Sequence, residues 1–255
     1  MEISKRLQAV ADLLAPGNCA ADIGCDHGYI SIYLITKGRF ASCIAMDVNP
    51  GPLDRARTHI QEKQLSTYID LRLSDGARAL GKGEADAAVI AGMGGRLTIK
   101  ILTESLDRFR EMKQFVLQPQ SEIHRVRRFL RENGFVILQE NMVKEEGKYY
   151  PMMRVAGENG SRDDERDAET VETMKAEDAY GPCLLRRRHP VLKEYLEKEE
   201  VLYESLLTQL RVKAAEKRGE GSQNKEPLRL NNAAKGLEER LLLIRRGLRW
   251  YDHEM

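Results

Sequence analysis

The chain has 255 residues, a length that accommodates one α/β catalytic domain and a smaller second unit. No apolar run reaches the length of a membrane span and residues 1–14 do not resemble a signal peptide, so we expect a cytoplasmic protein without membrane contact. The net charge of +1 does not indicate nucleic-acid binding, but it averages over the whole surface and leaves local basic patches open.

The four cysteines form neither a CxxC pair nor a regular spacing. This pattern supports neither a zinc site nor a disulfide framework, so we expect free thiols and no bound metal. The residues concerned are Cys19, Cys25, Cys43 and Cys183.

Seven β-rich runs alternate with helical patterns between about Asn18 and Val155. Such alternation predicts a mainly parallel sheet that is covered by helices on both faces. Only the turn KEEGK separates the last two runs, which predicts an antiparallel hairpin at the sheet edge. In chain order the runs are CAADIG, SCIAMDV, IDLRL, ADAAVIAG, QFVLQP, GFVILQENMV and YYPMMRVAG.

A glycine-containing segment, Asp22 to Gly28, directly follows the first expected strand. Glycines let the backbone turn sharply and approach a nucleotide-like cofactor at the carboxyl edge of a parallel sheet. Asp47 ends the second expected strand, where a carboxylate can accept hydrogen bonds from both ribose hydroxyls. A dehydrogenase is disfavoured, because Asp26 replaces the second glycine of G-x-G-x-x-G and its charge suits a sulfonium better than a pyrophosphate.

Two further glycine turns follow the third and fourth expected strands. Ser74-Asp75-Gly76 can receive an adenine amino group, although a simple Asp-Gly turn is equally common. The glycines of Ala91-Gly-Met-Gly-Gly95 would let an acceptor base approach a methyl donor. Enzymes that methylate exocyclic amines often carry an Asn/Asp-Pro-Pro-aromatic motif here, and this chain has none. We therefore expect the acceptor to be a different kind of atom.

The C-terminal part of the chain predicts a separate helical unit. The polar stretch 158–178 suits a linker or an exposed polar helix better than core, and residues 159–182 are interpreted as a linker between a catalytic domain, 1–158, and a helical hairpin, 183–255. Two amphipathic helices joined around residues 219–226 are expected to pair as an antiparallel coiled coil. Their apolar positions are Leu192, Leu196, Leu202, Tyr203, Leu206 and Leu210, then Leu237, Leu241, Ile244 and Leu248.

These motifs together resemble the bacterial tRNA (adenine(22)-N1)-methyltransferase family. The resemblance rests on ADIGCDHGYISIYL, DVNPGPLDRA, SDG, AGMGG and QPQ in this order, and it continues through YGPCLLRRRHPVLKEYL. It covers nearly the whole chain. It implies a Rossmann-like class I methyltransferase fold with a C-terminal coiled-coil hairpin, S-adenosyl-L-methionine as cofactor, S-adenosylhomocysteine as product, and tRNA as substrate.

The resemblance also implies roles for individual residues. Asp26 would stabilise the cationic product base, and Gly94 and Gly95 would border the target adenine. Adenine N1 has an in-plane lone pair, so His27 is expected to be a scaffold more than a general base. The expected cofactor-binding residues are Asp22, Gly24, Asp26, His27, Asp47, Val48, Asp75, Gly76, Gly92 and Met93.

Basic side chains are the candidates for a grip on RNA phosphates. We expect Arg6, Arg125, Arg128 and Arg186 to bind RNA, with a solvated helix face as the alternative for each helical group. Arg6 would alternatively place the methionine carboxylate. The wider clusters are Arg125, Arg127, Arg128 and Arg131, then residues 186–189, then Arg240, Arg245, Arg246 and Arg249.

Several alternatives remain open from the sequence. The same fold would serve a methyltransferase of another RNA base, a small molecule or a protein. An RNA-binding module that has lost activity is disfavoured by the intact Asp22, Asp47, Asp75 and AGMGG. We expect a monomer, with weak self-association through the C-terminal helices as the alternative.

Overall fold

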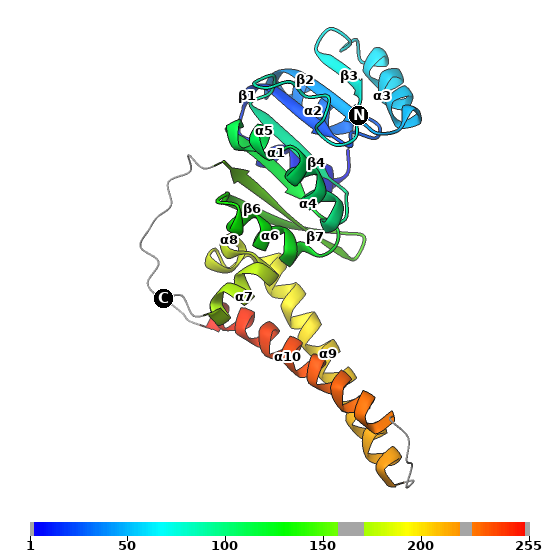
Figure 1. The fold of residues 1–255 in the computed structure, drawn as a ribbon, viewed down its shortest axis with the longest axis vertical. Coiled ribbons are helices and arrows are strands. Elements are labelled where there is room, and N and C mark those ends of the chain that lie inside the picture. The colour runs from blue at the N-terminus through cyan, green and yellow to red at the C-terminus, as the bar shows by residue number, and fades with distance from the viewer. Residues whose placement is uncertain (1–2, 158–170, 220–225, 253–255) are drawn as a thin grey trace. The chain divides into compact units, whose positions relative to one another are not determined.

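The computed structural model describes residues 3–157, 171–219 and 226–252. The chain forms two compact units, Met1–Asp167 and Ala168–Met255. Figure 1 shows a helix-covered sheet in the first unit and two long helices running side by side in the second. The glycine-rich segments that the sequence singles out all belong to the first unit.

A seven-stranded sheet forms the first unit, with the order β3-β2-β1-β4-β5-β7-β6. The first five strands pair in parallel, whereas β7 is antiparallel to both β5 and β6. This confirms the expected mainly parallel sheet with an antiparallel edge hairpin. The strands are β1 (Gly17–Ile23), β2 (Phe40–Asp47), β3 (Ile69–Leu73), β4 (Ala87–Ala91), β5 (Gln114–Gln118), β6 (Val136–Glu145) and β7 (Lys148–Ala156).

In the described part of the first unit, six helices cover the two faces of the sheet. Successive strand residues point to opposite faces, so apolar side chains on each face pack against helices. In β1, Ala21 and Ile23 pack in one core cluster with α4, α5 and α6, whereas Ala20 packs in another with α1, α2 and α3. The core is therefore two apolar layers, one on each face. The helices are α1 (Lys5–Leu13), α2 (Tyr29–Thr36), α3 (Pro50–Glu62), α4 (Gly95–Glu104), α5 (Leu106–Glu111) and α6 (Ile123–Glu132).

The parallel register brings the carboxyl ends of four central strands to one edge of the sheet. Ile23 in β1 lies opposite Met46 in β2 and Ile90 in β4. On the other side of β4, Ala91 lies opposite Gln118 in β5. Loops that are distant in the sequence therefore meet at this edge, where ligands bind in open α/β sheets.

The second unit contains α7 (Val171–Tyr180), α8 (Pro182–Arg186), α9 (Pro190–Gly219) and α10 (Glu226–Asp252). Within the expected linker, 159–182, residues 171–180 form α7, so this part follows the helical alternative for the polar stretch. Ala176 and Tyr180 of this helix are buried, so this polar stretch still supplies packing residues. Residues 158–170 lie outside the described part of the chain.

Helices α9 and α10 pair along an apolar seam, as the coiled-coil prediction requires. The buried positions of α10, Leu241 and Ile244, agree with the expected spacing. The expectation for α9 was wrong at Leu202 and Leu206, which are exposed. The seam runs one residue further along the helix, so Leu207 is buried instead. The buried α9 positions are Leu192, Leu196, Leu207 and Ala214.

Candidate active site

The loop after β1 takes a left-handed backbone conformation at three of its five residues. Gly24, Asp26 and Gly28 have φ values of 78°, 48° and 71°. The N–H groups of Gly24 and Cys25 both donate to the Met46 carbonyl, at 2.8 and 2.9 Å. Asp26 thus holds a conformation that glycine adopts more readily, which agrees with its place at the second glycine of the dinucleotide motif.

Asp47 closes this loop from the end of β2. Its Oδ2 accepts a hydrogen bond from the Asp26 N–H at 3.3 Å, and its Oδ1 accepts one from the Asn49 N–H at 3.0 Å. The carboxylate is almost completely buried. It therefore sits between the first and second loops, where a ribose-binding acid is expected.

Asp22 is a buried carboxylate that fixes the start of α2. Its Oδ2 accepts hydrogen bonds from the Ser31 hydroxyl at 2.8 Å and the Ser31 N–H at 3.2 Å. Burial raises the pKa of Asp22 to about 6, against the lowering effect of the two Ser31 hydrogen bonds. Asp22 thus ties the end of β1 to the first turn of α2 and fixes both ends of the loop between them.

Asp26 and His27 belong to a surface cluster that includes two residues of α3. The Asp26 carboxylate accepts a hydrogen bond from Arg55 Nη2 at 3.1 Å, and His27 Nε2 lies 3.6 Å from it. The rings of His27, Tyr29 and His59 stack with centroid separations of 5.2 to 5.6 Å. Arg55 therefore reduces the net charge at Asp26, and the ring stack fixes the orientation of His27.

An exposed apolar surface lies beside Asp47. Val48 directly follows Asp47 and is 56% exposed, while Leu73, opposite Asp47 on β3, is 61% exposed. Two exposed aliphatic side chains at adjacent strand ends fit the flat face of a purine. Asp75 lies just beyond Leu73, with Arg78 and Lys100 at 3.5 and 3.7 Å from its Oδ2.

The three glycines of the AGMGG segment differ in their structural environments. Gly92 is exposed and has a φ of 80°. A Cβ on Gly95 would lie 2.5 Å from the Ser121 carbonyl oxygen, whereas one on Gly94 would meet only the Ser121 hydroxyl, at 3.1 Å. Close packing against the loop after β5 therefore explains Gly95.

Met93 covers Gly24 across the edge of the sheet. A Cβ on Gly24 would lie 2.1 Å from the Met93 methyl carbon. The positive φ of Gly24 disfavours any side chain there, whereas the Met93 methyl is the end of a flexible side chain that could move aside. The two expected cofactor residues therefore lie in direct contact, although one follows β1 and the other follows β4.

Arg6 reaches the same edge from α1. Its Nη1 donates to Gln118 Oε1 at 2.8 Å, and its guanidinium carbon lies 5.5 Å from the centroid of the Tyr150 ring. A Cβ on Gly92 would lie 3.8 Å from both Arg6 Nη1 and Gln120 Nε2. The structure thus brings Arg6 to the AGMGG turn, which the sequence order alone does not indicate.

The arginines expected to bind RNA have different environments. Arg125 and Arg128 are exposed on α6, and Arg125 Nη1 lies 3.1 Å from Glu122 Oε1. Arg127 of the same cluster is buried in an ion pair with Glu140 at 2.9 Å, so it is unavailable to RNA. In the second unit, Arg186 pairs with Glu177 at 3.1 Å.

All four cysteines, which the structure describes in full, are free thiols as predicted. Within the described ranges, no group of three or more His, Cys, Asp or Glu side chains is placed to hold a metal ion. The described helices also include none that is both long and apolar enough to cross a bilayer.

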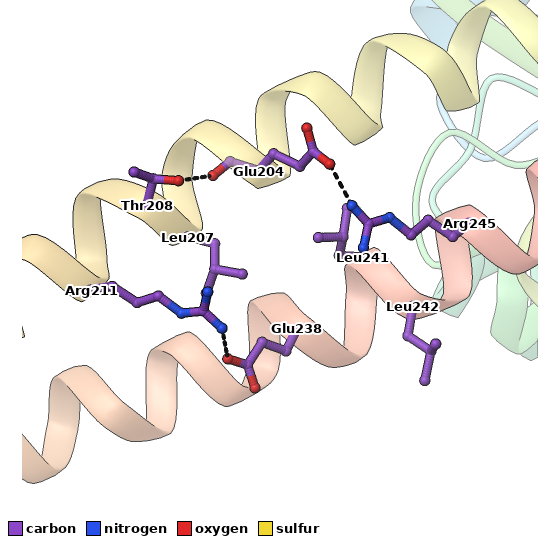
Figure 2. A pocket seen from close by; sticks show the side chains of 8 residues that line it. All are labelled: Glu204, Leu207, Thr208, Arg211, Glu238, Leu241, Leu242 and Arg245. Atoms are coloured by element: carbon purple, nitrogen blue, oxygen red, sulfur yellow. Dashed lines mark hydrogen bonds and ion pairs between the residues drawn. The ribbon is translucent and has the colours of Figure 1, made fainter.

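A groove of about 490 Å³ lies between α9 and α10. Figure 2 shows that ion pairs cross it, with Arg245 reaching Glu204 and Arg211 reaching Glu238. Its charges thus neutralise one another, which fits a helix-pairing surface better than a reactive site. The remaining lining residues are Leu207, Thr208, Leu241 and Leu242.

Comparison with known proteins places this geometry in a family. Residues 3–153 match the family model described as "Methyltransferase domain". The chain is 32% identical over 210 residues to the tRNA (adenine(22)-N(1))-methyltransferase of Bacillus subtilis, covering 81% of this chain and 86% of the relative. The chain belongs to the tRNA (adenine(22)-N1)-methyltransferase family. The match is longer than the first unit, so it extends into the helical unit.

Solved structures agree with this assignment. The Bacillus subtilis m1A22 tRNA methyltransferase TrmK superposes with a TM-score of 0.78 at 27% identity, covering 97% of this methyltransferase and 99% of that chain. Streptococcus pneumoniae Sp1610, solved in complex with S-adenosyl-L-methionine, superposes with a TM-score of 0.72 at 28% identity. That match covers 94% of this methyltransferase and 100% of the other chain. The Rossmann-like class I prediction is therefore confirmed.

Some residues that shape the site were not found from the sequence. Arg55 pairs with Asp26, Ser31 holds Asp22, and Leu73 adds an exposed apolar surface beside Asp47. Arg55 and Ser31 occupy ordinary helix positions, so no motif distinguishes them. Leu73 ends a strand just before Asp75, and that position at the ligand-binding edge was an available signal.

Proposed function

We propose that this methyltransferase transfers the methyl group of S-adenosyl-L-methionine to N1 of adenine 22 in tRNA. The observation that carries the proposal is the similarity to the Bacillus subtilis enzyme, which extends beyond the first unit into the second. The polar and apolar groups at the carboxyl edge of β1, β2 and β4 support it. They match the needs of a cationic nucleoside cofactor.

The cofactor would be held by residues at the carboxyl ends of four strands, β1 to β4. Asp47 would accept hydrogen bonds from the ribose hydroxyls, and Val48 with Leu73 would contact the adenine faces. Asp75 and the Gly76 turn would receive the adenine amino group. The methionine end would lie against the remaining proposed residues, Asp22, Gly24, Asp26, His27, Gly92 and Met93.

S-adenosyl-L-methionine supplies an electrophilic methyl group, whose bond to sulfur breaks as the bond to N1 forms. N1 attacks through its lone pair, so no side chain has to remove a proton. The main contribution of the protein is to position the base, with Gly94 and Gly95 beside it. The Asp26 carboxylate would stabilise the positive charge that develops on the adenine.

The RNA must present an unpaired adenine, since N1 lies on the base-pairing edge. Arg6, Arg125, Arg128 and Arg186 are proposed to contact phosphates and hold the surrounding RNA. We further propose that the protein acts as a monomer in the cytoplasm. Helices α9 and α10 would then either touch RNA or serve only to pair with each other.

The experiment is incubation with labelled S-adenosyl-L-methionine and an unmodified tRNA transcript, followed by nucleoside digestion and mass spectrometry. The matched substrate carries guanine in place of adenine 22, and the matched enzyme is Asp47→Ala. We expect 1-methyladenosine only with the wild-type enzyme and the unaltered transcript.

Other products would point to other acceptors. Label in another nucleoside, or 1-methyladenosine that persists in the guanine transcript, would contradict the proposed position. If the tRNA acquires no label although the cofactor clearly raises the melting temperature of the protein, the acceptor would be a small molecule or a protein.

A further inference from the structure

Arg6 carries a positive charge that no described carboxylate neutralises. It lies half-buried at the ligand-binding edge, and its polar partner is the side-chain oxygen of Gln118. The Tyr150 ring supports the guanidinium from a second direction. Among the described residues it forms no ion pair with Asp or Glu. This differs from many arginines of the chain, such as Arg55, Arg72 and Arg127.

Gln118 connects this charge to the AGMGG turn. Its side chain is only 1% exposed, at the end of β5. Its Oε1 accepts from Arg6 Nη1 at 2.8 Å and from the Gly92 N–H at 3.2 Å. One buried oxygen thus orients α1 and the turn after β4 together.

The choice of glutamine has an electrostatic consequence. A glutamate here would make the same two hydrogen bonds, but its negative charge would cancel that of Arg6. A neutral acceptor fixes the guanidinium and leaves its charge available. Gly92 has no side chain, and a Cβ built on it would lie 3.8 Å from both Arg6 Nη1 and Gln120 Nε2.

We propose that Gln118 is a positioning residue that holds Arg6 as the centre of an anion subsite beside Gly92. Its ligand is a carboxylate or phosphate oxygen, which guanidinium N–H groups bind with charge-assisted hydrogen bonds. The two sources are the methionine carboxylate of the cofactor and a phosphate of the RNA. This inference rests on the proposed function for the identity of both ligands.

The test compares Gln118→Glu with Gln118→Met and Arg6→Gln. Gln118→Glu keeps both acceptor contacts and loses only the long hydrogen bond from Gln118 Nε2 to the Pro119 carbonyl at 3.5 Å, so the variant should still fold. Its anion affinity should nevertheless fall by about 10-fold or more, as expected for the loss of one charged hydrogen bond. Gln118→Met removes the acceptor and leaves Arg6 unoriented. Arg6→Gln removes the charge at a partly exposed position and should reproduce the defect.

The pH profile separates electrostatics from packing. The introduced carboxyl of Gln118→Glu loses its charge as pH falls, so the affinity defect of that variant should shrink towards low pH. The defects of Gln118→Met and Arg6→Gln should not follow this trend. A role limited to packing would leave Gln118→Glu indistinguishable from the wild type at every pH.

Two binding measurements distinguish the ligand sources. Calorimetry with S-adenosyl-L-methionine and with 5′-methylthioadenosine, which lacks the carboxylate, tests the cofactor as the source. If the carboxylate binds here, the variants should bind S-adenosyl-L-methionine more weakly than the wild type does and bind 5′-methylthioadenosine equally well. Filter binding of tRNA reports on phosphate, and the slope of log K against log salt should lose about one unit if a phosphate binds here.

The proposal is overturned if Arg6→Gln or Gln118→Glu changes neither affinity. Binding of cofactor and tRNA is measured without turnover, so this result is independent of which nucleotide is methylated. Conversely, a wild-type enzyme that fails to form 1-methyladenosine but shows the calorimetric difference would overturn the proposed substrate and retain the anion subsite.

Discussion

The Asp47 carboxylate holds the backbone of Asp26, because its Oδ2 accepts the Asp26 N–H at 3.3 Å. The bond ties the end of β2 to a residue with a left-handed backbone in the loop after β1. Both functions proposed for Asp47, shaping this loop and binding ribose, therefore depend on the same two oxygen atoms. A substitution of Asp47 should therefore weaken cofactor binding more than it destabilises the fold.

Asp47→Ala should weaken binding of S-adenosyl-L-methionine by about 10-fold or more, since charge-assisted hydrogen bonds are lost. Asp47→Asn should also weaken it, because its amide nitrogen would face an N–H donor. Calorimetry measures both. Asp54→Ala is the control, as Asp54 is an exposed carboxylate of α3 that pairs with Arg57. Equal affinity in Asp47→Ala and wild type would refute the ribose assignment.

The raised pKa of Asp22 should make the free energy of unfolding depend on pH. Its pKa is raised to about 6 by burial, so the folded state binds the proton more tightly than the unfolded state does. The resulting stability is complete below the unfolded pKa near 3.8 and is lost as pH rises through about 6.

The experiment compares urea unfolding of the wild type and Asp22→Asn from pH 4 to pH 7. Other titrating groups cancel in the difference between the two proteins. The wild type should lose about 2 kcal/mol relative to the variant across this range, most of the effect of a shift of about two pKa units. A difference that does not change with pH would show that Asp22 has an ordinary pKa.

Gly94 and Gly95 should respond differently to alanine. A Cβ on Gly95 would lie 2.5 Å from a backbone oxygen, so Gly95→Ala should destabilise the fold by about 1–3 kcal/mol. Gly94→Ala meets only the Ser121 hydroxyl, which accepts a long hydrogen bond from the Gly95 N–H at 3.3 Å, and should cost less than about 1 kcal/mol. Denaturant unfolding measures both.

The methyltransferase activity of Gly94→Ala then tests whether the target adenine lies beside Gly94. The variant should fold normally and methylate more slowly if the adenine passes this position. Normal turnover in a folded Gly94→Ala would remove Gly94 from the proposed contacts. Equal stability of Gly95→Ala and wild type would instead show that the Ser121 contact does not restrict the glycine.

The sequence predicted the sheet well, since alternation of strand and helix patterns reflects burial on two faces. It also located Asp47 and the glycine turns, because the carboxyl ends of parallel strands share one edge. Contacts between distant segments were beyond it. Nothing in the local pattern places Arg6 against Gln118 or Met93 over Gly24. For α9 the sequence placed Leu192 and Leu196 correctly but wrongly added Leu202 and Leu206, which are apolar neighbours of the seam.

Arg125 and Arg128 give a prediction about RNA binding. Both are exposed on α6, which follows β5 at the ligand-binding edge. The double variant Arg125→Gln/Arg128→Gln should weaken tRNA binding and leave cofactor affinity unchanged, because phosphates and not the cofactor are the expected partners. The slope of log K against log salt should fall by about one unit for each lost phosphate contact.

The matched control for this pair is Lys113→Gln. Lys113 carries one positive charge, is exposed and pairs with Asp86 at 3.4 Å, and because it precedes β5 it lies at the opposite edge of the parallel strands. Filter binding over a range of salt concentrations should give it the wild-type slope. If the control changes the slope as much as the arginine pair does, tRNA binding follows overall charge and α6 has no specific part in it. A wild-type slope for the arginine pair would mean that α6 is only a solvated face.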